Sequence, residues 1–435
     1  MEYLSNWNTT SGTCSIRLRG DNINLRFLGG AGEVGRSAIL INEELLLDYG
    51  IKPTDPPSFP SNGMRPKTVI ISHGHLDHCG LIPNLMDLEP EIYCTSLTAR
   101  LSALLARDTL KIAQKKGQAI PYYNEEIQEF ERKVRPAGYR KDFGTNGYSA
   151  CFYDAGHIPG SCSVYIEKNR VSLLYTGDMN TVATELQNSA DMDLPESDIL
   201  MMESTYFNRD HTPRKVLEER FIESIKETVD NGGKAIIPAF SIGRTQEMML
   251  ILKKHGLHAY VDGMGVDVFN IMRRNPEYVR DINKLEKAIT SSNIIEPEDR
   301  KNIIREPSII VTSAGMLNGG PVFYYINEIF NDHKSKIHLT GYQAEGTNGR
   351  KAMERGYIED RSNIIHLKCQ LELYDFSAHC GDKELKEVAK RFTDSGTETV
   401  VLVHGENTQG FSAWIEEELG VKSLAPVNGA RVELK

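Results

Sequence analysis

Short apolar runs that end at a titratable residue recur along the first half of the chain. The stretch "KTVIIS" leads into His73, and "DILMME" ends at Glu203. Runs rich in β-branched residues and bounded by Gly and Pro are typical of strands. Because binding and catalytic groups are commonly placed on loops beside rigid elements, we expect these side chains to meet at one rim of a sheet sandwich. The strand ends concerned are Asp48, His73, His157, Asp178 and Glu203.

A glycine-rich stretch near the N-terminus has the spacing G-x-G-x-x-G, carried by Gly30, Gly32 and Gly35. A dinucleotide-binding loop needs a helix to open at such glycines, so that free N–H groups meet the pyrophosphate. Here the runs "SAILI" and "ELLLDYG" follow instead, separated by "NEE". Two short apolar runs around a polar turn predict a β-hairpin. The glycines therefore indicate a tight turn between strands rather than a nucleotide site.

The pattern changes after about residue 207. The segment "KVLEERFIESIKETVDNGG" has helical periodicity and a glycine stop. Four units of strand, loop and helix follow, beginning at "KAIIPAF", "HAYV", "SIIVTSAG" and "KIHLTGYQ". Strands that alternate with helices predict a parallel α/β domain. Because the first pattern returns in "NIIHLKCQLELYDFSAHCG" and "TVVLVHGE", we expect residues 207–363 to interrupt one domain made from residues 1–206 and 364–435.

Composition narrows the class of protein. A chain of 435 residues is long for one domain, and its 40% hydrophobic and 25% charged residues are typical of a globular protein. The seven cysteines include no C-x-x-C pair, which favours reduced thiols in the cytoplasm. No apolar run is long enough to span a bilayer, and the start lacks the pattern of a signal peptide. The net charge of -10 argues against binding nucleic acid by bulk charge.

Four potential metal ligands crowd into the sequence "HGHLDH", namely His73, His75, Asp77 and His78. Alternate residues of an extended segment project to the same side. His73 and His75 can therefore bind one ion, while Asp77 and His78 at the turn reach a second. Imidazole together with carboxylate favours zinc and, less strongly, manganese or iron.

Two neighbouring ions, about 3.5–4 Å apart, need a bridging carboxylate and further ligands. Three later motifs can supply them: His157 in "DAGHIPGS", Asp178 in "YTGDMN" and His404 in "VHGE". The set of ligands for a two-metal site is then complete. A polyanion could bind to such a site in spite of the acidic total charge.

The motifs resemble the metallo-β-lactamase superfamily, and in particular its β-CASP nucleases. These include the nuclease subunit of the mRNA 3′-end cleavage and polyadenylation specificity factor and its archaeal relatives. The resemblance rests on "LLLDYG", "HGHLDH", "YTGDMN", "MESTY", "FSAHCG" and "VHGE", in this order around an α/β insertion. It implies an αββα sandwich interrupted by a parallel β-CASP domain. DNA-processing members usually have an apolar residue at the position of His404, so the resemblance implies RNA as the substrate.

The resemblance also implies a role for each site residue. One zinc ion would bind to His73, His75 and His157, a second to Asp77, His78 and His404, and Asp178 would bridge them. Asp48 would orient a histidine or the metal-binding loop. In hydrolysis, Asp77 would position or deprotonate water, His379 would protonate the departing 3′ oxygen, and Glu203 would orient a histidine. The sequence "AHCG" departs from the common "AHAD" after His379, which leaves the setting of that residue open.

An anion path is expected in the inserted domain. The loops "SIGRTQ", "SAGMLNGG" and "GYQAEGTNGR" each precede a predicted helix, whose free N–H groups favour phosphate. Their candidate RNA contacts are Ser241, Arg244, Ser313, Thr347 and Arg350. The basic run "FERKVRPAGYRK" (residues 130–141) fits a solvated face better than a binding site.

The sequence therefore predicts a di-zinc ribonuclease that acts in mRNA 3′-end processing or in RNA maturation or decay. Two alternatives stay open: a small-molecule metallo-hydrolase of the same superfamily, and a catalytically silent RNA-binding paralogue. The pattern does not distinguish endonucleolytic from 5′→3′ exonucleolytic cutting. It also leaves a homodimer open.

Overall fold

The computed structural model describes residues 22–54, 56–119, 121–360 and 363–434. The start of the chain, where the sequence shows no signal-peptide pattern, lies outside these ranges. Within them, no helix combines the length and the apolar character that a membrane span requires. The six cysteines in the described part of the chain are free and buried.

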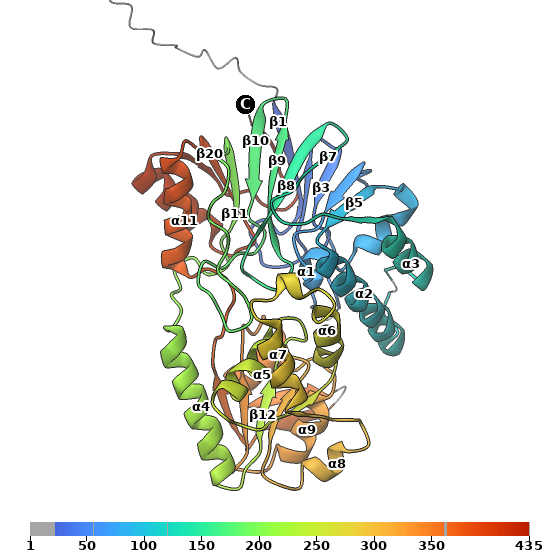
Figure 1. Cartoon of the computed structure of the whole chain (residues 1–435), viewed down its shortest axis with the longest axis vertical. Coiled ribbons are helices and arrows are strands. Elements are labelled where there is room, and N and C mark those ends of the chain that lie inside the picture. The colour runs from blue at the N-terminus through green and yellow to red at the C-terminus, as the bar shows by residue number, and fades with distance from the viewer. Residues whose placement is uncertain (1–21, 55, 120, 361–362, 435) are drawn as a thin grey trace, which may run out of the picture.

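Two seven-stranded sheets make up the upper body of the molecule (Figure 1). The first has the order β22-β1-β2-β3-β4-β5-β6, with bounds Arg431–Leu434, Ile23–Gly29, Ala38–Ile41, Leu45–Leu47, Thr68–Ile70, Glu91–Cys94 and Val134–Pro136. The second has the order β21-β20-β11-β10-β9-β8-β7, with bounds Lys422–Leu424, Thr399–Val403, Ile199–Glu203, Val171–Tyr175, Cys162–Lys168, Tyr148–Asp154 and Asp142–Thr145. In each sheet, one half is parallel and the other is antiparallel.

The two sheets pack face to face, and helices cover both outer faces. Phe27 and Ile70 of the first sheet share a core with Phe152 and Leu173 of the second. The first sheet carries α1 (Leu76–Cys79), the 3₁₀ helix Ile82–Leu88, α2 (Ser96–Lys116) and α3 (Asn124–Lys133). The second carries α11 (Asp382–Asp394), α12 (Thr408–Trp414) and the π-helical turn Ile415–Leu419. This arrangement confirms the predicted αββα sandwich, because each apolar sheet face is covered by another layer.

A third sheet, parallel throughout, forms the lower body (Figure 1). Its order is β14-β13-β15-β12-β16-β19, with bounds Asn293–Ile294, Tyr260–Asp262, Ile309–Thr312, Ala235–Pro238, Lys336–Leu339 and Gln370–Leu373. Its central strands are buried along their whole length, as expected for parallel strands covered on both faces. The accompanying helices are α4 (Arg214–Asp230), α5 (Arg244–Lys254), α6 (Gly265–Met272), the 3₁₀ helix Pro276–Tyr278, α7 (Ile282–Thr290), α8 (Arg300–Ile303), α9 (Val322–Ile329) and α10 (Asn348–Arg355). The inserted parallel α/β domain is thereby confirmed.

The chain leaves the third sheet later than residue 363. The hairpin of β17 (Tyr357–Asp360) and β18 (Asn363–His366) is followed by β19, which pairs in parallel with β16. Only after β19 does the chain return to the sandwich through α11 and β20. The expected break at 363 therefore falls before the last strand of this sheet. The division into domains at 206 and 363 stays a prediction.

The glycine-rich stretch forms the turn between β1 and β2, and β2 pairs with β3 as an antiparallel hairpin. The predicted turn is therefore confirmed. One large element was not predicted, because only the strand-like apolar runs of the first half of the chain were interpreted. Helix α2 spans 21 residues, with Thr95 accepting a hydrogen bond from the amide of Thr98 and Gly117 closing the helix in the left-handed conformation. Its Ala, Leu, Lys and Arg content favours a helix and could have revealed it.

Candidate active site

The strand ends of the sandwich bring the predicted ligands to one edge. His73 and His75 follow β4, with Asp77 and His78 on the short helix α1. His157 lies in the loop between β8 and β9, Asp178 follows β10 and His404 follows β20. Asp48 and His404 have φ angles of 58° and 49°, a region that non-glycine residues rarely adopt. Strained backbone of this kind clusters at functional sites.

Three imidazoles form a first group of donors. Nδ1 of His75 lies 3.2 Å from Nε2 of His73 and 3.0 Å from Nε2 of His157. Burial lowers the pKa of His73 and His157 well below the ordinary value and that of His75 to about 4. At neutral pH these rings are uncharged, so their lone pairs are available to a metal ion.

Asp77, His78 and His404 form a second group. Nε2 of His404 lies 3.3 Å from Nε2 of His78 and 3.3 Å from Oδ2 of Asp77. Burial opposes ionisation of Asp77, but His78 and His404 outweigh it and lower its pKa. The group therefore offers a carboxylate together with two imidazoles.

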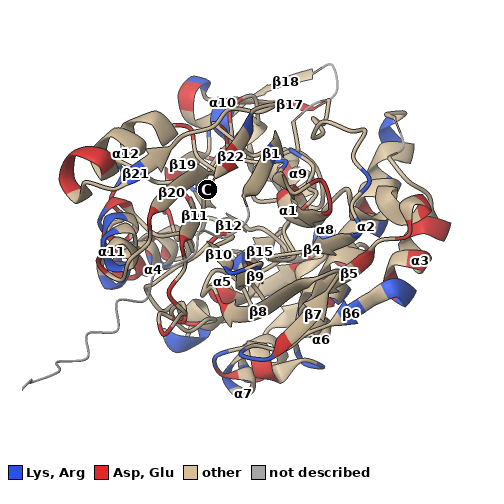
Figure 2. Cartoon of the chain, turned by 90° about the horizontal axis from the view of Figure 1, so that it is seen from above, with Lys and Arg blue, Asp and Glu red and all other residues tan. Residues whose placement is uncertain are grey.

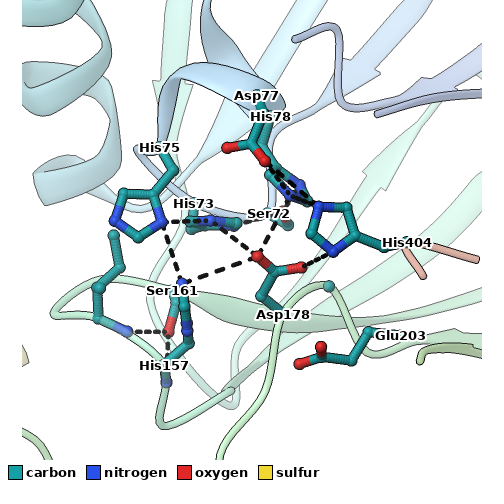
Figure 3. A network of polar contacts seen from close by, with 12 residues as sticks. Ser72, His73, His75, Asp77, His78, His157, Ser161, Asp178, Glu203 and His404 are labelled. Atoms are coloured by element: carbon teal, nitrogen blue, oxygen red, sulfur yellow. Dashed lines mark hydrogen bonds and ion pairs between the residues drawn. The ribbon is translucent and has the colours of Figure 1, made fainter. Parts of the chain in front are cut away.

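Asp178 lies between the two groups (Figure 3). Its Oδ2 is 3.6 Å from Nε2 of His73, 3.8 Å from that of His157 and 3.4 Å from that of His78. Its Oδ1 is buried 3.2 Å from Nδ1 of His404 and makes no hydrogen bond within the described part of the chain. An orphaned carboxylate oxygen among imidazole nitrogens is the arrangement expected of a ligand shared by two cations. The donor set thus fits two metal ions.

Hydrogen bonds to the far side of two rings fix which nitrogen faces the site. Nδ1 of His78 donates to Oδ2 of Asp48 at 2.8 Å, and Nδ1 of His157 donates to the carbonyl of Ala378 at 2.7 Å. Nε2 of each ring then faces the site, as in metal sites generally. Burial opposes the charged form of His78, but Asp178, Asp48 and Asp77 outweigh it and raise its pKa well above the ordinary value. This ring must therefore release a proton when a metal ion binds. Asp48 is fully buried and also accepts from Ser72 and Tyr175.

His379 and Glu203 form a pair beside the donor groups. Nδ1 of His379 lies 2.8 Å from Oε2 of Glu203, which is fully buried at the end of β11. Nε2 of His379 faces the site, 3.9 Å from Oδ2 of Asp178. Burial opposes the charged ring, but Glu203 and Asp178 outweigh it and raise the pKa of His379 to about 9. The ring can therefore hold a proton near neutral pH.

The three expected anion loops lie side by side at the carboxyl edge of the third sheet. The side-chain amides of Gln343 and Asn348 donate to the carbonyls of Gly315 and Leu317. The backbone N–H of Gly349 donates to the carbonyl of Met316. The loops open α5, α9 and α10, as predicted.

The candidate side chains on these loops have different surroundings. Arg244 donates to the carbonyl of Thr340, and burial lowers its pKa to about 10. The hydroxyl of Thr347 caps α10 by accepting from the amide of Arg350. Arg350 is exposed and pairs with Glu354. Ser313 is buried, and Ser241 is half-buried.

A cavity of about 240 Å³ adjoins the His379 side of the site. Tyr206, which lines it, has its ring centroid 5.9 Å from that of His379. His211, another lining residue, has a buried Nε2 with no partner among the described residues. Sequence reasoning gave neither residue a role. Tyr206 is the last residue of the motif "MESTY", whereas His211 lies in no pattern that could have revealed it. A larger cavity of about 670 Å³ lies at the β14 edge of the third sheet, and none of its lining residues belongs to the donor groups.

The basic run of residues 130–141 lies on a solvated face, as predicted. Arg135 pairs with Glu91, and Arg140 pairs with Asp191 and Asp193. Figure 2 shows basic and acidic residues interspersed over this view of the molecule. The run therefore offers little unpaired charge to a nucleic acid.

Comparisons with known proteins agree with this fold. Residues 245–351 match the Beta-Casp domain, and residues 364–426 match a Zn-dependent metallo-hydrolase RNA specificity domain. The chain is 35% identical to RNase aCSPSF2 of Saccharolobus solfataricus, over 97% of this chain and 87% of that protein. It is 37% identical to the probable RNase MJ4 of Methanocaldococcus jannaschii, over 94% and 99%.

Two further likenesses extend the comparison. Transcription termination factor FttA of Methanocaldococcus jannaschii is 31% identical, over 97% of this chain and 73% of that protein. A crystal structure of a protein of unknown function from Enterococcus faecalis V583 matches with a TM-score of 0.59 and 12% identity, over 95% of this chain and 100% of that one. The latter likeness shows the fold alone. With its sandwich, its inserted parallel sheet and these relatives, the chain belongs to the β-CASP ribonuclease family of the metallo-β-lactamase superfamily.

Proposed function

We propose that this protein is a zinc-dependent ribonuclease that hydrolyses RNA phosphodiester bonds by a two-metal mechanism. The observation that carries the proposal is the pair of donor groups around Asp178, with His379 and Glu203 beside them. Relatives named as RNases and as a transcription termination factor support a role in RNA processing or termination. The six free cysteines of the described chain fit the reducing cytoplasm.

The donor chemistry supports the proposal of two zinc ions. His73, His75 and His157 would hold one ion, Asp77, His78 and His404 the other, and Asp178 would be shared. When bound, zinc supplies water of lowered pKa and neutralises charge on phosphoryl oxygens. Asp48 keeps the ring of His78 turned so that Nε2 faces the site.

Side chains of the protein accept and donate the protons that are transferred in the reaction. Water attacks phosphorus in line, so that a new O–P bond forms while the bond to the 3′ oxygen breaks. Asp77 takes a proton from the attacking water, and Nε2 of His379 gives one to the departing 3′ oxygen. Glu203 holds Nδ1 of His379, so that the transferable proton stays on Nε2. The products are a 5′ phosphate and a 3′ hydroxyl.

RNA would reach the site across the carboxyl edge of the third sheet. The three neighbouring loops supply the candidate contacts Ser241, Arg244, Ser313, Thr347 and Arg350. Arg209 and Arg350 line the cavity beside His379, together with Asp210 and Asp375, and offer cationic groups to a phosphate next to the cleavage site. Tyr206 and Tyr342 line the same cavity and offer rings on which a base can stack.

Two other functions are weaker accounts of the same site. A silent RNA-binding paralogue would be expected to lack metal ligands, whereas the described residues include two full donor groups. A small-molecule hydrolase would not need three loops that precede helices, beside the metal ligands, to bind its substrate. Both alternatives predict that the purified protein leaves RNA intact.

Substrate choice can be measured directly. The zinc-loaded protein is expected to cut RNA and to leave DNA of the same sequence and bis(4-nitrophenyl) phosphate nearly uncut. A circular RNA, run beside a linear one with a 5′ monophosphate, reports the mode of cutting, because only an endonuclease opens the circle. Cutting of DNA or of the small diester at the RNA rate would refute the assignment of RNA as the substrate.

A further inference from the structure

Glu247 of helix α5 joins the lower body, which is built around the third sheet and is called the third-sheet body below, to the sandwich. Its side chain is 5% exposed, and its carboxylate accepts hydrogen bonds from the amides of Glu185 at 3.1 Å and Leu186 at 2.7 Å. Both amides belong to the loop between β10 and β11 of the second sheet. A buried carboxylate on one body is thus satisfied by the backbone of the other.

The same carboxylate forms an ion pair with Arg214, the first residue of α4. Arg214 also donates from Nη1 to the carbonyl of Ser377 at 3.1 Å. Its guanidinium lies 5.1 Å from the ring centroid of Phe376. Arg214 therefore connects Glu247 to the chain segment that contains His379.

That segment, residues 376–379, supports two side chains of the site. The carbonyl of Ala378 accepts the hydrogen bond that orients His157, and the amide of His379 donates to Oγ of Ser377. His379 lies in this irregular stretch between β19 and α11, and Glu203 holds its ring. A displacement of the stretch would move the imidazole away from the leaving oxygen.

We propose that Arg214 and Glu247 form a positioning pair, which fixes residues 376–379 and thereby aligns His379 for proton donation. The proposal rests on the ribonuclease function argued above. It goes beyond that function because it makes docking of the third-sheet body on the sandwich a condition for rapid proton transfer. Neither residue touches the donor groups, so the pair acts through the backbone that it holds.

Glu247→Gln tests the pair, because glutamine keeps the shape but loses the charge that binds Arg214. Misplacement of a reacting group by about 1 Å costs on the order of 100-fold in rate, so we expect kcat on RNA to fall by about 10- to 100-fold. With zinc in excess, KM and zinc content should stay at the wild-type values. An RNA with sulfur in place of the bridging 3′ oxygen has a leaving group that needs no proton. On that substrate the variant should recover to near the wild-type rate.

A second readout does not depend on activity. Hydrogen exchange should become faster at the amides of Glu185 and Leu186 and in the peptide that covers residues 376–381. The matched control is Glu218→Gln, which also removes a charge from a buried glutamate between α4 and α5. Glu218 pairs with Lys254 and His255, away from residues 376–379, so kcat and exchange in that peptide should stay unchanged. Arg214→Lys serves as a second variant, judged by the same readouts.

The possible failures can be told apart. If the wild-type protein does not cut RNA, the proposed function is wrong. If the wild type cuts and Glu247→Gln cuts equally fast, only the positioning pair is refuted. A slow variant that has lost zinc, or that stays equally slow on the sulfur substrate, would also overturn it. If Glu247→Gln does not fold, the same outcomes of Arg214→Lys decide the question.

Discussion

Replacing His379 with alanine is expected to slow RNA cleavage by about 10²–10⁴-fold, the usual contribution of a general acid, without loss of zinc. The reason lies in the geometry of the ring. Nδ1 is held by Glu203, and Nε2 faces the donor groups from 3.9 Å. His379 belongs to neither of the two groups assigned to zinc, so its removal should leave both ions and RNA binding in place.

The sulfur substrate separates this role from others. With a 3′ sulfur as the leaving atom, His379→Ala should cut at close to the wild-type rate, because the thiolate departs without a proton. The control is His366→Ala, since His366 is exposed on β18 and has no contact with the site. If His379→Ala stays equally slow on the sulfur RNA, then His379 is not the acid, and holding of the phosphate becomes the better account.

Replacing His404 with alanine is expected to remove one of the two zinc ions and nearly all RNA cleavage. The loss should be about 10³-fold or more, because a metal ion contributes several kcal/mol of transition-state stabilisation. His404 lies within 3.3 Å of both other members of the second group. Elemental analysis of the purified variant should therefore give about one zinc ion per chain instead of about two.

Asp48→Asn is the matched comparison for His404→Ala. Asp48 lies outside the donor groups. It holds Nδ1 of His78 and also accepts hydrogen bonds from Ser72 and Tyr175. Loss of such an orienting partner typically costs about 10–100-fold in metal affinity, so excess zinc should restore cleavage to Asp48→Asn but not to His404→Ala. Full zinc content and full activity in His404→Ala would contradict the assignment of the second group.

Much of the candidate site could be predicted from the sequence, because the end of a strand is marked by the residues next to it in the chain. The apolar runs before His73, Asp178 and His404 predict both the strands and the point at which each side chain enters the loop region. Their convergence then follows from the sandwich, since the loops after β4, β10 and β20 share one edge. The alternation of strands and helices likewise predicts a parallel inserted sheet.

What the sequence could not predict depends on contacts between distant segments. Asp48 meets Tyr175 of the second sheet only after the first two sheets have packed. The order β14-β13-β15-β12-β16-β19 depends on where each crossover returns, which the strand pattern leaves open. Arg214 and Glu247 carried no signal of their own, because an ion pair 33 residues apart in the chain is visible only in the fold.

The most direct test of the central claim is zinc titration of the metal-free protein with RNA cleavage as the readout. Protein stripped by a chelator, and shown by elemental analysis to contain no zinc, manganese or iron, should leave RNA uncut. Cleavage should return as zinc is added and reach its maximum near two equivalents per chain, about the number that the two donor groups hold. Undiminished RNA cleavage by the verified metal-free protein would contradict the account.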